Sequence, residues 1–305
     1  MVYIFAALYK EAEALIQTFG LKKVCENSKF QEFTNEEKGI CLVITGVGSI
    51  PAAVAVSCAC SQYGIREEDF LVNIGTCASA EAIGKVYLCN KIIEEHTGRT
   101  FYPDVLFKHP FQEGQVLTCG KVVSGGLLEM CQKQSEKSNK ENGNEQELKE
   151  KQSWEQQPRV YDMEAAAVYQ AGAYFFAPHQ MSFLKVVSDN GQGDGITPKR
   201  IEEVMGNASP MMVEYVEGLC EIASKEKAQR KDFSNEVKEL IQKVCEDLHC
   251  SKTMEFSLHQ HFRYLMLTGV DVKKEIQKWY EDEKLPCKDR REGKKRFEEL
   301  KAELF

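Results

Sequence analysis

Short apolar runs alternate with amphipathic segments over the first 223 residues. The apolar runs lie at residues 2–8, 40–45, 70–75, 85–93, 115–123 and 183–189. Several of them lack polar alternation, which is typical of strands buried on both faces. Segments with helical spacing lie between them, at residues 11–19, 51–63, 163–175 and from Pro198 onward. This alternation predicts an α/β fold built around a central sheet.

Two parts of the chain do not fit that pattern. Residues 132–157 contain only Leu148 and Trp154 as sizeable apolar residues, too few to offset the cost of ordering the backbone. We expect an exposed polar insertion there, within a domain of residues 1–223.

Residues 224–305 turn highly charged and predict a small all-α appendage whose role the sequence does not disclose. One helical stripe consists of Phe233, Val237, Leu240, Ile241, Val244 and Leu248. A second segment runs from Met254 to Gly269, a residue type common just past helix ends. A third begins after Asp271, a plausible N-cap, and the fourth is FEELKAELF.

The composition narrows the class of partner. The chain has 305 residues, of which 43% are hydrophobic, and its net charge is −8. A nucleic-acid surface would require clustered Lys and Arg, so we expect no nucleic-acid partner. The opening apolar run is too short for a membrane span and has no cationic segment before it. We expect a cytoplasmic protein that does not enter a membrane.

The 12 cysteines favour reduced thiols over disulfides or metal. Half of them fall inside apolar stretches, where a free thiol acts as a small hydrophobe: Cys41, Cys58, Cys60, Cys77, Cys89 and Cys119. The closest approach to a metal cluster is Cys245, His249 and Cys250, with His259 and His261 downstream, and it lacks the paired spacing of a zinc site. We therefore expect no metal.

Polar residues gather in four stretches where predicted strands end. The first contains Glu11, at the start of a helix, and the second is TGVGS, residues 45–49. The third is NIGTCAS, residues 73–79, and the fourth pairs YDMEA with VVSD, which ends at Asp189. None of them is a P-loop or a dinucleotide fingerprint. Ligands of open α/β sheets bind beyond the carboxyl ends of strands, so these stretches mark the candidate site.

In this order the stretches resemble the nucleoside phosphorylase and nucleosidase superfamily, above all its 5′-methylthioadenosine/S-adenosylhomocysteine nucleosidases. The resemblance covers about residues 1–223, and DMEAAAV and VVSD are its most specific parts. It implies a three-layer α/β/α fold around a mixed sheet, a homodimer, and cleavage of the N-glycosidic bond of a purine nucleoside without a cofactor.

The resemblance also implies roles for single residues. Asp189 matches the acid that protonates N7 of the leaving purine, and Glu11 matches the carboxylate that activates water. Glu164 matches the acceptor of the ribose 2′- and 3′-hydroxyls, and Met163 the side chain that packs on the sugar. Such division of labour between acids suits an oxocarbenium-like transition state. Asp162, in contrast, we interpret as an N-cap or loop carboxylate.

Four further residues complete the predicted site. Ser188 is expected to orient Asp189. Gly75 and Thr76 belong to the stretch beside the water or anion site, and Val123 lies in the strand that borders the base. In that strand, Lys121, Val122 and Val123 stand where the family has an acid and an aromatic ring.

Water is favoured over phosphate as the nucleophile. Phosphorylases of the superfamily hold phosphate with arginines, whereas Asn73 and Ile74 occupy the place before Gly75 here. Arginine suits phosphate because of its planar fork. A role for Arg99 as an anion contact is left open.

The substrate and the role of the tail are left with alternatives. A purine nucleoside of the methylthioadenosine type is the default, and another purine nucleoside, a futalosine-like compound or a nucleotide is compatible with the altered base strand. There are two competing interpretations. One is a phosphorylase, and the other is a non-catalytic nucleoside-binding protein with a protein partner on its helical tail.

Overall fold

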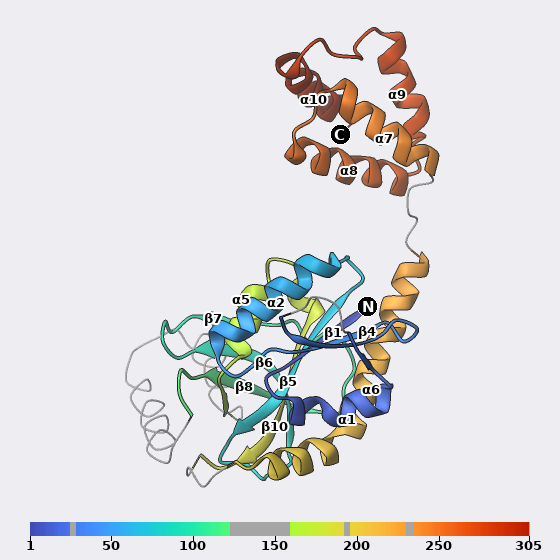
Figure 1. Ribbon diagram of the computed structural model, residues 1–305. Coiled ribbons are helices and arrows are strands. Elements are labelled where there is room, and N and C mark those ends of the chain that lie inside the picture. The colour runs from blue at the N-terminus through green and yellow to red at the C-terminus, as the bar shows by residue number, and fades with distance from the viewer. Residues whose placement is uncertain (25–28, 123–158, 192–195, 230–234, 305) are drawn as a thin grey trace, which may run out of the picture. The chain divides into compact units, whose positions relative to one another are not determined.

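The computed structural model describes residues 1–24, 29–122, 159–191, 196–229 and 235–304. The chain divides into two compact units, residues 1–229 and residues 230–305 (Figure 1). The first unit carries the strands and the second carries helices. The predicted insertion at residues 132–157 and the predicted site residue Val123 lie outside the described residues.

The first unit extends past the boundary predicted at residue 224. Helix α6 (Pro198–Gln229) continues through that point as one helix. Its apolar stripe ends at Ala223, which is buried, and residues 224–228 are exposed. Lys, Glu, Ala and Gln are strong helix formers, which explains why the helix outlasts its buried face.

The mixed α/β architecture and the mixed sheet are confirmed. The strands at the predicted runs are β1 (Val2–Ala6), β4 (Ile40–Ile44), β5 (Phe70–Ala78), β6 (Val86–Glu94), β8 (Gln112–Thr118) and β10 (Met181–Asp189). Strand β8 starts earlier than predicted and stops at Thr118, so Lys121 and Val122 follow the strand and do not lie in it. There the backbone N–H of Cys119 donates to the carbonyl of Asp162 at 2.7 Å.

Four short strands were not predicted: β2 (Lys22–Lys23), β3 (Gln31–Asn35), β7 (Thr100–Phe101) and β9 (Arg159–Asp162). Strand β9 corrects the prediction that a helix begins around Asp162. The helix α5 (Ala165–Gly172) starts later, with Glu164 at its N-cap position.

The sheet closes on itself at the strands that carry the site. Strand β5 pairs in parallel with β1 and with β10, and antiparallel with β9 through Ala78 and Tyr161. The ring is completed because β10 pairs with β6, β6 with β8, and β8 with β9. The ends of β5, β9 and β10 are therefore brought to one place.

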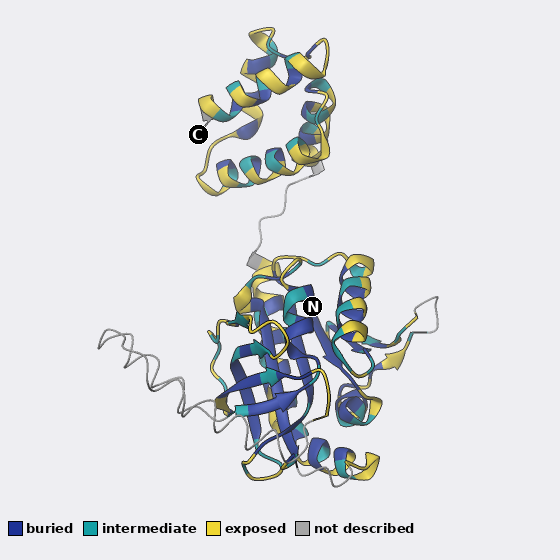
Figure 2. Ribbon diagram, turned by 90° about the vertical axis from the view of Figure 1, so that its left-hand side faces the viewer, coloured by how far each residue is buried: buried dark blue, intermediate teal, exposed yellow. Residues whose placement is uncertain are grey.

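Helices pack against both faces of this sheet (Figures 1 and 2). Alternate residues of β1 enter different apolar clusters: Val2 and Ile4 pack with α1 (Tyr9–Phe19) and α6, whereas Tyr3 and Phe5 pack with α2 (Ser49–Tyr63) and α5. A short 3₁₀ turn, η1 (Pro178–Gln180), precedes β10.

Small residues let α5 approach the sheet closely. A Cβ on Gly172 would lie 3.0 Å from both Leu71 and Met181 side chains. Ala165 and Ala166 are fully buried. The alanine-rich DMEAAAV stretch thus fixes α5, and the residues just before it, against β5 and β10.

The second unit has a core of its own. The helices of this unit are α7 (Asn235–Asp247), α8 (Lys252–Leu267), α9 (Val272–Glu281) and α10 (Arg290–Leu304). The predicted N-cap is confirmed, because the Asp271 carboxylate accepts hydrogen bonds from the backbone N–H groups of Lys273 and Lys274. Helix α10 begins earlier than predicted, and Gly293 lets it pack against the Leu248 carbonyl without a Cβ clash.

The described cysteines are all free thiols, although Cys58 is exposed on α2 and not buried as its apolar surroundings suggest. Within the described residues, no cluster of His, Cys, Asp and Glu is arranged to hold a metal ion. No helix in that part of the chain is long and apolar enough to cross a membrane.

Candidate active site

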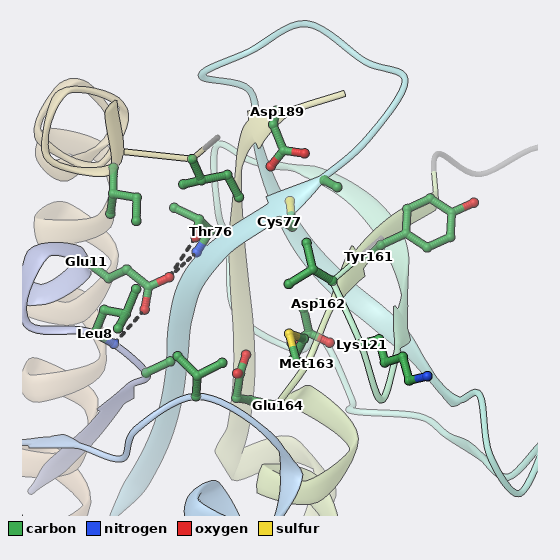
Figure 3. A pocket seen from close by; sticks show the side chains of 16 residues that line it. Leu8, Glu11, Thr76, Cys77, Lys121, Tyr161, Asp162, Met163, Glu164 and Asp189 are labelled. Carbon is green, nitrogen blue, oxygen red and sulfur yellow. Dashed lines mark hydrogen bonds between the residues drawn. The ribbon is translucent and has the colours of Figure 1, made fainter. Parts of the chain in front are cut away.

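A cavity of about 230 Å³ opens at the ends of β1, β5, β9 and β10. Its wall includes three carboxylates from separate parts of the chain, Glu11, Glu164 and Asp189, together with Thr76 and Met163. Figure 3 shows these side chains around one space. The pairing of β1, β9 and β10 with β5 brings them together.

Glu11 is held rigidly at one side of the cavity. It lies in the first turn of α1 and is 4% exposed. The hydroxyl and the backbone N–H of Thr76 donate to its Oε1 at 2.8 and 2.7 Å, and the N–H of Leu8 donates to its Oε2 at 2.9 Å. Thr76 therefore positions Glu11 directly, by two hydrogen bonds from the end of β5.

Gly75 leaves the space that Glu11 occupies. A Cβ at this position would lie 3.3 Å from Glu11 Oε1 and 3.6 Å from Lys185 Nζ. The predicted site residue Gly75 thus borders the carboxylate from the sheet side.

With Glu11 in the role that the resemblance implies, replacing Gly75 with alanine is expected to displace its carboxylate by a few tenths of an ångström and to lower kcat by about tenfold, because a water-activating group tolerates little misplacement. Steady-state kinetics measures the effect. Gly218→Ala in α6, where a Cβ meets nothing within 4 Å, is the matched control. Equal rates for Gly75→Ala and wild type would show that the position of Glu11 does not limit turnover.

Met163 and Glu164 lie between β9 and α5, and the start of α2 holds them. The N–H of Gly48 donates to Glu164 Oε1 at 2.7 Å, and the Ser49 hydroxyl donates to the Met163 carbonyl at 3.2 Å. The TGVGS turn thus positions the DMEA stretch.

Glu164 has an unusual protonation equilibrium for a carboxyl group. Burial, reinforced by the nearby charge of Asp162, raises its pKa to about 7, although Lys185 and the Gly48 amide act in the opposite direction. The group therefore changes charge near neutral pH.

A buried ion pair, absent from the sequence prediction, underlies the carboxylates. Lys185 is 1% exposed, and its Nζ lies 2.7 Å from Asp162 Oδ2. Burial opposes the charge on Lys185, but Asp162, Glu164 and Glu11 outweigh it and hold its pKa above the ordinary value. Lys185 thus supplies positive charge beneath an otherwise acidic site.

Asp162 is more than the loop carboxylate that the sequence suggests. Its Oδ2 accepts the Ala165 N–H at 2.8 Å, which agrees with a capping role. Its Oδ1 also accepts the Thr118 hydroxyl at 2.8 Å. Together with Lys185 it ties β9, β8 and β10 to the start of α5.

Asp189 stands at the end of β10, on another side of the cavity (Figure 3). The Ser188 hydroxyl donates to its Oδ2 at 2.8 Å, and the Gly191 N–H donates to its Oδ1 at 2.8 Å. Ser188 therefore contacts Asp189 as expected for an orienting residue. An adjoining pocket of about 320 Å³ shares Asp189 with the cavity and contains Arg200.

The structure thus gathers most of the predicted site. Glu11, Thr76, Met163, Glu164 and Asp189 line the cavity. Gly75 and Ser188 support them from behind. Lys121 and Val122 also line the cavity, from the segment after β8. Three carboxyl groups from different segments of the chain, Glu11, Glu164 and Asp189, thus face one cavity.

Among the comparisons with known proteins, the one with solved structures gives matches. No protein-family model matches the sequence, and a comparison with curated proteins finds no match. Solved structures match well. A 5′-methylthioadenosine nucleosidase from Arabidopsis thaliana matches with a TM-score of 0.55 at 17% identity, over 72% of this chain and 95% of that one.

Two bacterial structures match similarly. The 5′-methylthioadenosine/S-adenosylhomocysteine nucleosidase from Neisseria meningitidis, in complex with methylthio-immucillin-A, has a TM-score of 0.55 and 17% identity, covering 71% of this chain and 98% of its own. The enzyme from S. pneumoniae, with a transition-state inhibitor, has a TM-score of 0.52 and 17% identity, covering 72% and 99%. In fold, this chain is therefore similar to 5′-methylthioadenosine/S-adenosylhomocysteine nucleosidases.

Proposed function

We propose that the protein hydrolyses the N-glycosidic bond of a purine nucleoside. The observation that supports this most is the convergence of Glu11, Glu164 and Asp189 on one cavity. Glycosidic cleavage requires an acid at the leaving group and a carboxylate that directs water to the sugar. The similar structures from Arabidopsis thaliana, Neisseria meningitidis and S. pneumoniae are all named as nucleosidases, which favours the same reaction.

In this proposal each carboxylate has its own task. Glu11, fixed by Thr76 and Leu8, accepts a proton from the attacking water. Asp189, oriented by Ser188, donates a proton to N7 of the departing purine. Glu164 accepts hydrogen bonds from the ribose 2′- and 3′-hydroxyls, while Met163 packs on the sugar.

Water remains the proposed nucleophile. Among the described lining residues of the cavity there is no arginine that could cradle phosphate beside Glu11. Arg200 belongs to the adjoining pocket, next to Asp189. Phosphate near Glu11 and Glu164 would also be repelled by their charges, which disfavours a phosphorylase.

The lining favours an uncharged nucleoside over a nucleotide. Leu8, Val47, Ile196 and Ile201 provide apolar surface. A phosphate would meet four carboxyl groups, with Lys121 as the one cation among the described lining residues. A substrate of the methylthioadenosine or S-adenosylhomocysteine type is the default, as in the neighbour that binds methylthio-immucillin-A.

The proposal also covers the fold, the oligomeric state, the cellular location and the cofactor requirement. It includes a three-layer α/β/α arrangement, a homodimer, a cytoplasmic location and no cofactor. A non-catalytic nucleoside sensor is disfavoured because such a protein has no need of all three carboxylates.

Nucleoside affinity is expected to strengthen as pH rises to about 7 and then to level off. The pKa of Glu164 is about 7, so below it the carboxyl is protonated and must lose its proton to accept both ribose hydroxyls. Each pH unit below the pKa then costs up to about tenfold in affinity.

Calorimetric titration of 5′-methylthioadenosine into the Asp189→Asn chain, from about pH 5 to about pH 8, tests this without turnover. A further Glu164→Gln substitution should flatten the profile. An affinity that does not change with pH while Glu164 is intact would contradict its role as the hydroxyl acceptor.

A nucleoside panel tests the proposed reaction class. The chain is incubated with 5′-methylthioadenosine, S-adenosylhomocysteine, adenosine and inosine, with and without phosphate. We expect free purine base and free sugar from at least one of them at a rate independent of phosphate. A thermal shift with a nucleoside but no product from any would support the sensor instead.

A further inference from the structure

Two thiols meet at the end of helix α7, inside the second unit. Cys245 lies in the last turn of that helix, and Cys250 lies just past its end. Both are half-buried and pack against the apolar core of the unit. Their side chains are hydrogen-bonded to each other. This contact between two cysteines has no part in the proposed hydrolysis.

The turn between the two cysteines has the hydrogen bonds of a Schellman motif. The N–H of Cys250 donates to the carbonyl of Cys245 at 2.9 Å, and the N–H of His249 donates to the carbonyl of Glu246 at 3.0 Å. His249 has a φ of 50°, the left-handed conformation that the motif requires. The first and last residues of such a motif commonly bring their side chains into contact. The backbone itself therefore sets the two thiols side by side.

The same turn keeps the cysteines within the span of a disulfide. With 2.9 Å between the Cys250 nitrogen and the Cys245 oxygen, standard bond lengths hold the two Cα atoms within about 7 Å. Disulfides join Cα atoms up to about 7 Å apart. The turn is also held from outside, because the Cys287 N–H donates to the Asp247 carbonyl at 2.8 Å and His249 Nε2 lies 3.1 Å from the Cys287 carbonyl oxygen. The two thiols are thus presented in a preformed geometry.

We propose that Cys245 and Cys250 are a redox modification site, at which they form a reversible disulfide by exchange with a small disulfide such as glutathione disulfide. The Cys250 thiolate attacks one sulfur of the small disulfide, which gives a mixed disulfide and releases one small thiolate. Cys245 then loses its proton, and its sulfur attacks the Cys250 sulfur, which releases the second small thiolate. Two protein thiols are oxidised, and one small disulfide is reduced to two thiols.

The hydrogen bond between the thiols assigns the first attack to Cys250. It lowers the pKa of Cys250, although burial and the charge of Glu255 oppose this. The same hydrogen bond, together with burial and nearby negative charge, raises the pKa of Cys245. Cys250 is therefore the readier thiolate, which is the attacking form. The disulfide closes the turn directly before Ser251, the N-cap of α8, so oxidation fixes the connection between α7 and α8.

Peptide mass mapping of the full chain tests the site. Cleavage after Lys and Arg releases residues 244–252 as one peptide, which contains these two cysteines alone. After incubation with glutathione disulfide and alkylation in denaturant, we expect this peptide to be unalkylated and two hydrogens lighter than its reduced form. Dithiothreitol should restore both thiols.

The matched control within the chain is Cys220, which is also half-buried and is the one cysteine of peptide 201–225. Burial raises the pKa of its thiol to about 11. It should therefore stay reduced and become alkylated in the same sample. This comparison separates the paired thiols from general thiol oxidation, and it does not depend on the hydrolase proposal, because the pair lies outside the unit that carries the cavity.

Two variants separate the roles of the thiols. Cys245→Ser should accumulate a mixed disulfide between Cys250 and glutathione, because the second attacking thiol is missing. Cys250→Ser should form a mixed disulfide at Cys245 at least about tenfold more slowly, because the readier thiolate is lost. Circular dichroism verifies that both variants remain helical. The inference is overturned if the wild-type peptide stays fully alkylated, carries glutathione without an internal bond, or is cross-linked to another chain, or if the two variants react equally fast.

Discussion

Asp189→Asn is expected to lower kcat by about 10²- to 10⁴-fold, the usual range for loss of a positioned proton donor. Asparagine is nearly isosteric and can still accept the hydrogen bond of Ser188 or Gly191. The substitution therefore removes the proton and leaves the cavity in place. Nucleoside affinity should stay within about threefold of wild type, since the interaction lost is specific to the transition state.

Initial rates of purine release, measured together with affinity by calorimetry, separate these effects. The matched control is Asp282→Asn, which removes an exposed carboxylate in the second unit and should keep full activity. A rate for Asp189→Asn within about threefold of wild type would eliminate Asp189 as the acid.

Lys185→Met is expected to have the largest effect on stability, a loss of about 3–5 kcal/mol in the free energy of unfolding. Lys185 and Asp162 form an ion pair with side chains 1% and 0% exposed. Removal of the lysine leaves Asp162, and the charge of Glu164 close by, buried without compensation. The unmatched carboxylates should also disturb Glu11, so activity should fall.

The matched control is Lys85→Met, which removes a lysine paired with Glu81 at the surface and should cost under about 1 kcal/mol. Denaturation is best followed by hydrogen exchange in β5 and β10, because Trp279 is buried in the core of the second unit and its fluorescence reports on that unit. Equal protection of β10 in Lys185→Met and wild type would refute the structural role of the pair.

Hydrophobic patterning predicted the framework of the fold because the predicted strands are the most apolar ones. β1, β4, β5 and β10 have nearly continuous burial. Strand β9 escaped prediction because it has four residues and forms through pairing with β8. The closure of the ring through Ala78 and Tyr161 is likewise a tertiary event that no local pattern announces.

The carboxylates of the site and the orienting Ser188 were predicted from motifs, whereas the buried ion pair beside them was not. Glu11, Glu164 and Asp189 stand in stretches that resemble the nucleosidases, whereas Lys185 was treated as one residue of a strand. A signal was present, because a lysine inside FLKVVSD must be buried with an acid partner. Which acid it meets depends on the strand pairing, since Asp162 and Lys185 are brought together because β9 and β10 both pair with β5.

Product analysis in phosphate-free buffer, with wild type and Glu11→Gln side by side, tests the central claim most directly. Wild type should release purine base and free ribose sugar in equal amounts, and added phosphate should change neither rate nor product. Glu11→Gln should bind nucleoside yet turn over at least about 100-fold more slowly. Formation of a sugar 1-phosphate, or undiminished turnover by Glu11→Gln, would contradict hydrolysis directed by Glu11.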